Sequence, residues 1–136
     1  MNQFDPNTRW RQRYENYKKS LNLLSDHLDY NKSSELERAG IIQFFEMTFE
    51  LSWKLLKDYL VSQGYIVNSP REAIKQAFQA EVIENGEIWI EALSSRNLLS
   101  HTYDEDKAIE ISEKIVNQFY PELLNLSNYF EGIKNE

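Results

Sequence analysis

Hydrophobic residues recur at helical spacing along nearly the whole chain. The first stripe has steps of three and four residues, which predicts an amphipathic helix over about residues 8–28. Its members are Trp10, Tyr14, Tyr17, Leu21, Leu24 and Leu28. The polar stretch over residues 29–33 that follows favours a loop.

The second predicted helix is long and apolar over most of its circumference. It begins at the capping-box sequence Ser34-Glu35-Leu36-Glu37, in which the Ser hydroxyl accepts from the amide three residues later, and it continues to about Gln63. Its narrow polar stripe consists of Gln43, Glu46, Glu50, Lys54 and Lys57. A helix with so little polar surface is buried on more than one side, so we expect part of it to face a second subunit. Gly64 is expected to end this helix.

A second capping box, Ser69-Pro70-Arg71-Glu72, predicts a short helix with Pro at its first position. The residues expected on its buried face are Ile74, Ala77, Phe78 and Val82. Taken alone, the pair Asn85-Gly86 between apolar runs is a hairpin signal. We reject the hairpin because no other strand is predicted to pair with it and because the spacing after Gly86 stays helical through Leu99.

The last part of the chain predicts a helix over about residues 104–119, and Pro121 either kinks this helix or starts a new one. The residues expected to face inward are Ala108, Ile111, Ile115 and Phe119, followed by Leu123, Leu124, Leu126, Tyr129 and Phe130. We therefore predict an all-α fold, an antiparallel up-and-down bundle of four to five helices that forms one domain over residues 1–136 and dimerises.

Composition excludes several classes of protein. The chain has 136 residues, 41% of them hydrophobic, which is enough for one core. It has no Cys and only two His, so we expect no disulfide framework, no metal site and no cofactor. The polar N-terminus and the lack of a long apolar run predict no secretory signal, no membrane span and a cytoplasmic location. The net charge of −7 argues against a general nucleic-acid coat protein, but it allows a local phosphate site.

The segment from Arg96 to Tyr103 carries the strongest candidate chemistry. Arg96 falls among the apolar rows of its predicted helix, where an Arg needs a carboxylate, a phosphate or water to satisfy it. Arg96 and His101 are five residues apart, which is roughly 140° around a straight helix. They converge only if the helix ends near residue 100 or if a second copy brings its own pair alongside. Asn97 lies four residues before His101 and could orient its imidazole.

Several pieces of the chain together carry a family resemblance. They are Glu50-Leu51-Ser52-Trp53-Lys54 with Leu60 and Gly64, then Ser69-Pro70-Arg71-Glu72 with Ile74 and Phe78, then Trp89, and finally Arg96-Asn97 through His101-Thr102-Tyr103. In this order and spacing the chain resembles the nucleotidyltransferase substrate-binding protein family, within the HEPN superfamily of all-helical nucleotide- and RNA-handling domains.

The resemblance implies a homodimeric helical bundle that is partnered with a separately encoded minimal nucleotidyltransferase. Many such proteins are viewed as the toxin half of a toxin–antitoxin pair. In them, Arg, four residues and His mark a metal-independent ribonuclease site at the dimer seam, which maps onto Arg96 and His101, with Asn97 in support. Tyr103 matches the Tyr to which the partner enzyme attaches AMP to silence the toxin.

These residue types suit RNA cleavage without a metal. A His with a reference pKa of about 6.5 can take the proton of the 2′-hydroxyl or protonate the leaving oxygen, and an Arg can bind two phosphate oxygens. Two alternatives remain open. The chain could be a non-catalytic subunit that presents a nucleotide or substrate to the transferase. Alternatively, Arg96 neutralises a core Glu such as Glu50 and the motif has no chemistry.

Overall fold

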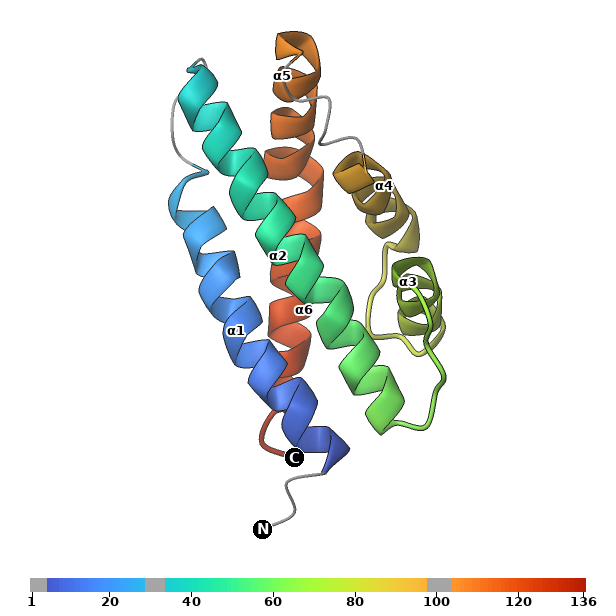
Figure 1. The fold of residues 1–136 in the computed structure, drawn as a ribbon. Coiled ribbons are helices and arrows are strands. Elements are labelled where there is room, and N and C mark those ends of the chain that lie inside the picture. The colour runs from blue at the N-terminus through green and yellow to red at the C-terminus, as the bar shows by residue number, and fades with distance from the viewer. Residues whose placement is uncertain (1–4, 29–33, 98–103) are drawn as a thin grey trace.

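The computed structural model describes residues 5–28, 34–97 and 104–136, and every regular element within them is a helix (Figure 1). The elements are α1 (Pro6–Asp26), α2 (Glu35–Ser62), α3 (Pro70–Gln79), α4 (Gly86–Asn97), α5 (Glu105–Lys114), a π-helical segment η2 (Ile115–Phe119) and α6 (Tyr120–Ile133). The all-α prediction and the rejection of the hairpin are therefore confirmed. The loop predicted over residues 29–33 and the last turn predicted up to Leu99 lie outside the described residues.

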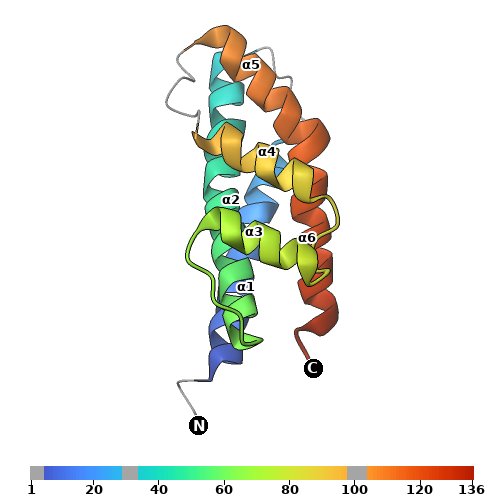
Figure 2. The same ribbon diagram turned by 90° about the vertical axis from the view of Figure 1, so that its right-hand side faces the viewer.

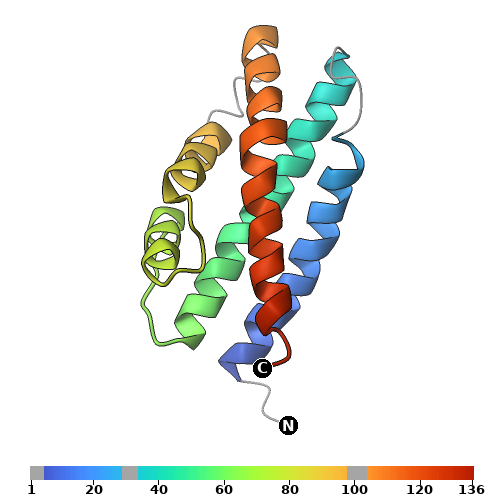
Figure 3. The same cartoon turned by 180° about the vertical axis from the view of Figure 1, so that it is seen from behind.

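Three long rods make up the body of the molecule. Helix α1 runs one way, while α2 and the continuous rod α5–η2–α6 run the other way (Figures 1 and 3). Helices α3 and α4 lie side by side across α2, as Figure 2 shows. The antiparallel prediction therefore holds for α1 against the other two rods, but not for α2 against α5–η2–α6, which run in the same direction, nor for this pair. The 28 residues of α2 span about 42 Å, whereas the 10 and 12 residues of α3 and α4 span about 15 and 18 Å. Neither short helix alone is long enough to bring the chain back from the end of α2 to the start of α5.

Two side-chain caps mark the starts of α2 and α3, and a glycine marks the end of α2. The Ser34 Oγ accepts from the Glu37 amide at 3.3 Å, and the Ser69 Oγ accepts from the Glu72 amide at 3.1 Å, so both predicted capping boxes start a helix. Gly64 has a φ of 96°, which terminates α2 in the left-handed region, as predicted. These local signals determine how long α2 is and where α3 begins.

The core lies between α2 and the elements around it. Helix α2 contacts α1, α3, α4, α5 and η2. The Phe45 ring of α2 stacks on Phe119 with centroids 5.5 Å apart, and the Phe49 ring lies 6.1 Å from that of Trp89. These four aromatic side chains are buried and contribute large apolar areas to the core. Helix α2 is therefore the element against which these five are positioned.

Two residues predicted to be buried are exposed. Phe78 is 52% exposed and Leu124 is 40% exposed, because each lies at the edge of its helix's apolar face. In α3 the buried face consists of Ala73, Ile74 and Ala77. Small Ala side chains there let α3 approach α2 closely, which leaves the larger Phe78 ring on the outer side.

The π-helical segment has a physical cause in the sequence. The buried residues Ile111, Ile115, Phe119 and Leu123 are separated by three consecutive steps of four. In an α-helix each step of four overshoots a full turn by about 40°, so three steps drift about 120° away from the core. The wider turn of a π-helix absorbs this drift, and all four side chains stay buried. Pro121 sits in the first turn of α6 and does not interrupt the rod.

Candidate functional site

Arg96 lies in the last turn of α4, and its guanidinium contacts α2. Its Nη1 donates to the Glu50 Oε1 and forms an ion pair, and its Nη2 donates to the Asn97 Oδ1 at 3.1 Å. The Arg96 side chain is 23% exposed and that of Glu50 is 36% exposed, so solvent reaches the pair. The expected carboxylate partner of Arg96 is therefore present, although Glu50 is a half-exposed residue rather than a core one.

Glu50 has contacts on both of its carboxylate oxygens. Its Oε1 accepts from Arg96, whereas its Oε2 accepts from the Trp53 indole Nε1 at 2.9 Å and lies 3.9 Å from the Lys54 Nζ. Glu50, Trp53 and Lys54 are at positions i, i+3 and i+4 of α2, which places them side by side on one face of the helix. The side chain of Trp53 also packs against the core. The carboxylate is thus held from its own helix and from α4.

Core packing brings Arg96 to Glu50. Phe49 precedes Glu50 in α2, and its ring contacts that of Trp89, which lies two turns before Arg96 in α4. Ala92 and Ser95 continue the buried face of α4 between these two positions. A contact between two aromatic residues therefore determines where the two polar partners meet.

The other predicted site residues divide into two groups. His101 and Tyr103 lie outside the described residues, so the convergence of Arg96 with His101 and the role of Tyr103 stay predictions. Asn97, which we expected to orient His101, accepts a hydrogen bond from the Arg96 guanidinium with its Oδ1. The site that the structure describes therefore consists of Arg96, Asn97 and Glu50 with its neighbours on α2.

Helix α2 also contacts the beginning of α5. The Arg38 guanidinium, on a side chain that is 7% exposed, pairs with the Glu105 carboxylate. The chain on both sides of residues 98–103 is therefore held against α2, by a carboxylate of α2 at the α4 end and by a guanidinium of α2 at the α5 end. Sequence reasoning missed Arg38 and Glu105, because no local pattern indicates a pair of residues 67 positions apart.

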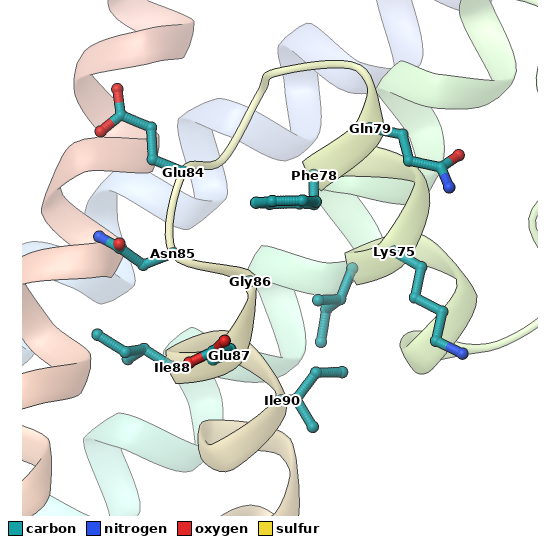
Figure 4. A pocket seen from close by; sticks show the side chains of 10 residues that line it. Lys75, Phe78, Gln79, Glu84, Asn85, Gly86, Glu87, Ile88 and Ile90 are labelled. Carbon is teal, nitrogen blue, oxygen red and sulfur yellow. The ribbon is translucent and has the colours of Figure 1, made fainter.

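A separate hollow lies between α3 and the first turns of α4 (Figure 4). Its volume is about 760 Å³, and apolar side chains of Ile74, Phe78, Ile88 and Ile90 contribute to its lining. Lys75 and Gln79 extend outward from α3 in the same view. The hollow is at the opposite end of α4 from Arg96, so it is distinct from the Glu50–Arg96 pair.

The marked pKa shifts of Glu131 and Tyr14 occur where α6 meets α1. Hydrogen bonds from Lys134 and Tyr14 lower the pKa of the Glu131 carboxyl to about 2. Burial, followed by the bond to Glu131, raises the pKa of Tyr14 to about 12. His27 is the C-cap residue of α1. These groups stabilise the packing of the rods.

The described residues contain no cluster of three or more His, Asp or Glu side chains placed to hold a metal ion. None of the helices in these ranges combines the length and the apolar character needed to cross a membrane. The fold and the site thus define the class of protein, which is an all-helical bundle with an Arg–carboxylate pair. The Arg of this pair lies in the last turn of a short helix, and a His-containing segment follows that helix.

Comparisons with known proteins place the chain within this class more closely. A family described as nucleotidyltransferase substrate binding protein like matches residues 12–131, so the chain belongs to that family. A probable ribonuclease HepT from Haemophilus influenzae is 32% identical over 84 residues, covering 57% of this chain and 56% of that protein. The chain therefore matches about half the length of this curated relative.

A solved structure has a similar fold. The crystal structure of ttk003001694 from Thermus thermophilus superposes with a TM-score of 0.74 and 28% sequence identity, over 88% of this chain and 99% of that one. The family expected from the sequence motifs is thus confirmed, and it is HepT-like.

Proposed function

We propose that the chain is the HEPN-type partner subunit of a minimal nucleotidyltransferase and the toxin half of a toxin–antitoxin pair, with a metal-independent ribonuclease site made by Arg96 and His101. The observation that carries the proposal is the Arg96 guanidinium, which is reachable by solvent and held by Glu50 and Asn97 directly before the segment that contains His101. The similarity to a probable ribonuclease supports the same reaction.

The proposed reaction needs one base, one acid and one cation. A His101 imidazole takes the proton of the ribose 2′-hydroxyl, the 2′-oxygen attacks phosphorus, and the 5′-oxygen leaves with a proton from a second imidazole. The products are a 2′,3′-cyclic phosphate and a free 5′-hydroxyl. General acid–base groups and charge-stabilising donors each contribute roughly 10²–10⁴ in rate.

Arg96 is suited to be the cation of this site. A guanidinium has five N–H donors, and the bonds to Glu50 and Asn97 use one on each Nη. The remaining donors can bind phosphate oxygens as negative charge develops on them. In the proposed homodimer, each protomer supplies one Arg96 and one His101 to a shared cleft, which provides both the acid and the base.

Silencing by the partner transferase is a separable part of the proposal. The transferase would join the α-phosphate of ATP to the Tyr103 hydroxyl and release pyrophosphate. The attached AMP would place a charged group two residues from His101 and block access of RNA. Besides ATP and the partner enzyme, this step needs only a reachable Tyr103 hydroxyl, whose proton is released as its oxygen bonds to the phosphate.

Two other readings have an observation in their favour. The net charge of −7 disfavours RNA binding and suits a subunit that presents a nucleotide or substrate to the transferase without cleaving RNA. The Arg96–Glu50 pair also suits a structural role, in which an Arg96→Ala variant would lose stability and nothing else.

The two histidines of the chain provide a direct test. We expect the purified protein to cleave RNA at neutral pH in the presence of EDTA, and His101→Ala to slow cleavage by about 10²-fold or more. His27→Ala, at the end of α1, is the matched control and should cleave like the wild type. Equal cleavage by His101→Ala, or no cleavage by the wild type across the pH range, would exclude the ribonuclease function. Nucleotide binding without RNA cleavage would favour the presenting subunit.

The modification is tested by mass spectrometry with the partner transferase and ATP. We expect the wild type to gain the mass of one AMP and Tyr103→Phe to gain none. If the two proteins gain AMP equally, or neither does, Tyr103 does not have this role, and the cleavage result is unaffected.

A further inference from the structure

We propose that Glu50 is a positioning residue for Arg96 and that the Trp53 indole N–H orients Glu50 for this task. The proposal rests on the ribonuclease function described above, in which Arg96 contacts the reacting phosphate. It assigns a role to two residues of α2, well away in sequence from the Arg96–His101 motif.

The two carboxylate oxygens of Glu50 have different partners. The Oε2 accepts the Trp53 Nε1–H at 2.9 Å, within one turn of α2, and this bond restricts rotation of the carboxylate. The Oε1 is then directed at α4, where it accepts from the Arg96 Nη1. A rigid core residue next to Glu50, Phe49, keeps the two helices at the required separation through its contact with Trp89.

The exposure of the pair argues for positioning rather than for stability. Ion pairs with side chains as exposed as Glu50 and Arg96 contribute little to folding, because water screens them. They can still select one conformation of a long Arg side chain, and a guanidinium that is already oriented stabilises developing charge without reorganisation. Asn97 holds the other Nη, so two acceptors define the plane of the guanidinium.

Trp53 supplies a contact that a different aromatic residue would not. Its ring packs against the core, which a Phe ring would also do, but only the indole has an N–H for the Glu50 Oε2. Replacing Trp53 with Phe therefore removes the orienting hydrogen bond and keeps most of the packing. The effect of Trp53 on Arg96 must pass through Glu50.

Steady-state kinetics on a defined RNA oligonucleotide test the proposal. We expect Glu50→Gln to lower kcat at least about tenfold, and Trp53→Phe to lower it less but in the same direction, because small displacements of a catalytic group are costly. KM and the melting temperature should change little in both. The control is Glu46→Gln, an exposed residue one turn earlier on α2, which should cleave like the wild type. An unchanged kcat in Glu50→Gln would overturn the proposal.

A second measurement does not depend on cleavage. In nitrogen-15 NMR spectra, we expect the Arg96 guanidinium N–H signals of the wild type to show restricted rotation. In Glu50→Gln and Trp53→Phe the guanidinium should rotate freely, so that its separate N–H signals merge into averaged ones. If Trp53→Phe leaves these signals as in the wild type, the positioning role is wrong. If the wild type does not cleave RNA but the signals respond as expected, the ribonuclease function fails and the positioning of Arg96 stands.

Discussion

Two glycines of the α2 region show how a single residue acts on stability through the backbone. Gly64 ends α2 with a φ of 96°, a backbone conformation that residues with a Cβ rarely adopt. Gly40 lies inside α2, and a Cβ placed on it would meet no other atom within 4 Å. The first glycine is required by geometry, whereas the second costs helix stability without an evident structural need.

Alanine substitutions at these two positions should have opposite signs. We expect Gly64→Ala to lower the free energy of unfolding by roughly 1–2 kcal/mol, the cost of a left-handed conformation for an L-residue. Gly40→Ala should raise it by about 0.5–1 kcal/mol, because Ala has a higher helix propensity than Gly. Urea unfolding followed by circular dichroism measures both. A loss of stability in Gly40→Ala comparable to that in Gly64→Ala would contradict this account.

For single residues, the sequence predicted the contacts that join residues close together in the chain. The caps at Ser34 and Ser69 were readable because each bond joins residues three apart. The need of Arg96 for a carboxylate was readable from its place among apolar rows, but Glu50 could be named only as a candidate. The pair of Arg38 with Glu105 was not readable, because tertiary structure alone brings them together.

Among the elements, the rod α5–η2–α6 shows how hydrophobic spacing determines helix geometry. The buried residues of this rod are Ile111, Ile115, Phe119 and Leu123. The stretch from the first to the last of them is one residue longer than a regular α-helix would need to keep all four on one face. The extra residue is absorbed in η2, where the exposed Asn117 and Gln118 lie. Helices α5 and α6 can therefore bury one continuous face.

Deletion of Asn117 tests this explanation. We expect the shortened rod to become regular α-helix with its buried face intact, so that the protein still folds and melts cooperatively. Deletion of the exposed Asn16 in α1 is the control. It rotates half of the α1 stripe by about 100° and should prevent cooperative folding. If both deletions unfold the protein equally in thermal melts, η2 does not absorb the extra residue.

The existence of the helices could be predicted, but not all of their directions. The hydrophobic spacing of α3 and α4 predicts which face of each helix is apolar. It does not predict that both helices cross α2. That crossing depends on the short helix lengths and on small buried residues such as Ala73 and Ala77. The exposure of Phe78 follows from the same packing, which is why its burial was predicted wrongly.

On the scale of the whole molecule, α1 and α6 are linked by a hydrogen-bonded network. The Tyr14 hydroxyl of α1 donates to the Glu131 Oε2 of α6 at 2.6 Å, and Lys134 pairs with the same carboxylate at 2.7 Å. Nearby, the Tyr17 hydroxyl donates to the Leu123 carbonyl oxygen at 2.6 Å. The first and last helices are thereby held together although they are distant in sequence.

This network predicts how stability depends on pH. The pKa of Glu131 is lowered from 4.5 to about 2 in the folded protein, so its stabilising effect is present above about pH 4.5 and is lost as the pH falls toward 2. We expect the difference in free energy of unfolding between the wild type and Glu131→Gln to shrink over this window. A difference that stays constant between pH 5 and pH 2 would show that the carboxylate is not stabilised in this way.

Helix α2 supports the proposed site from two positions. Helix α2 contributes Glu50 to the end of α4 and Arg38 to the start of α5, so one element supports the chain on both sides of residues 98–103. The position of Arg96 is therefore a property of the packed molecule and not of α4 alone.

Whether Arg96 acts in the reaction is decided by the rate at which Arg96→Ala cleaves RNA, measured beside the wild type at equal concentration of folded protein. We expect a loss of roughly 10²–10⁴-fold, since the variant lacks the cation that we propose stabilises charge on the phosphate. A variant that cleaves at the wild-type rate, with only a lower melting temperature, would show that Arg96 serves the fold and not the reaction.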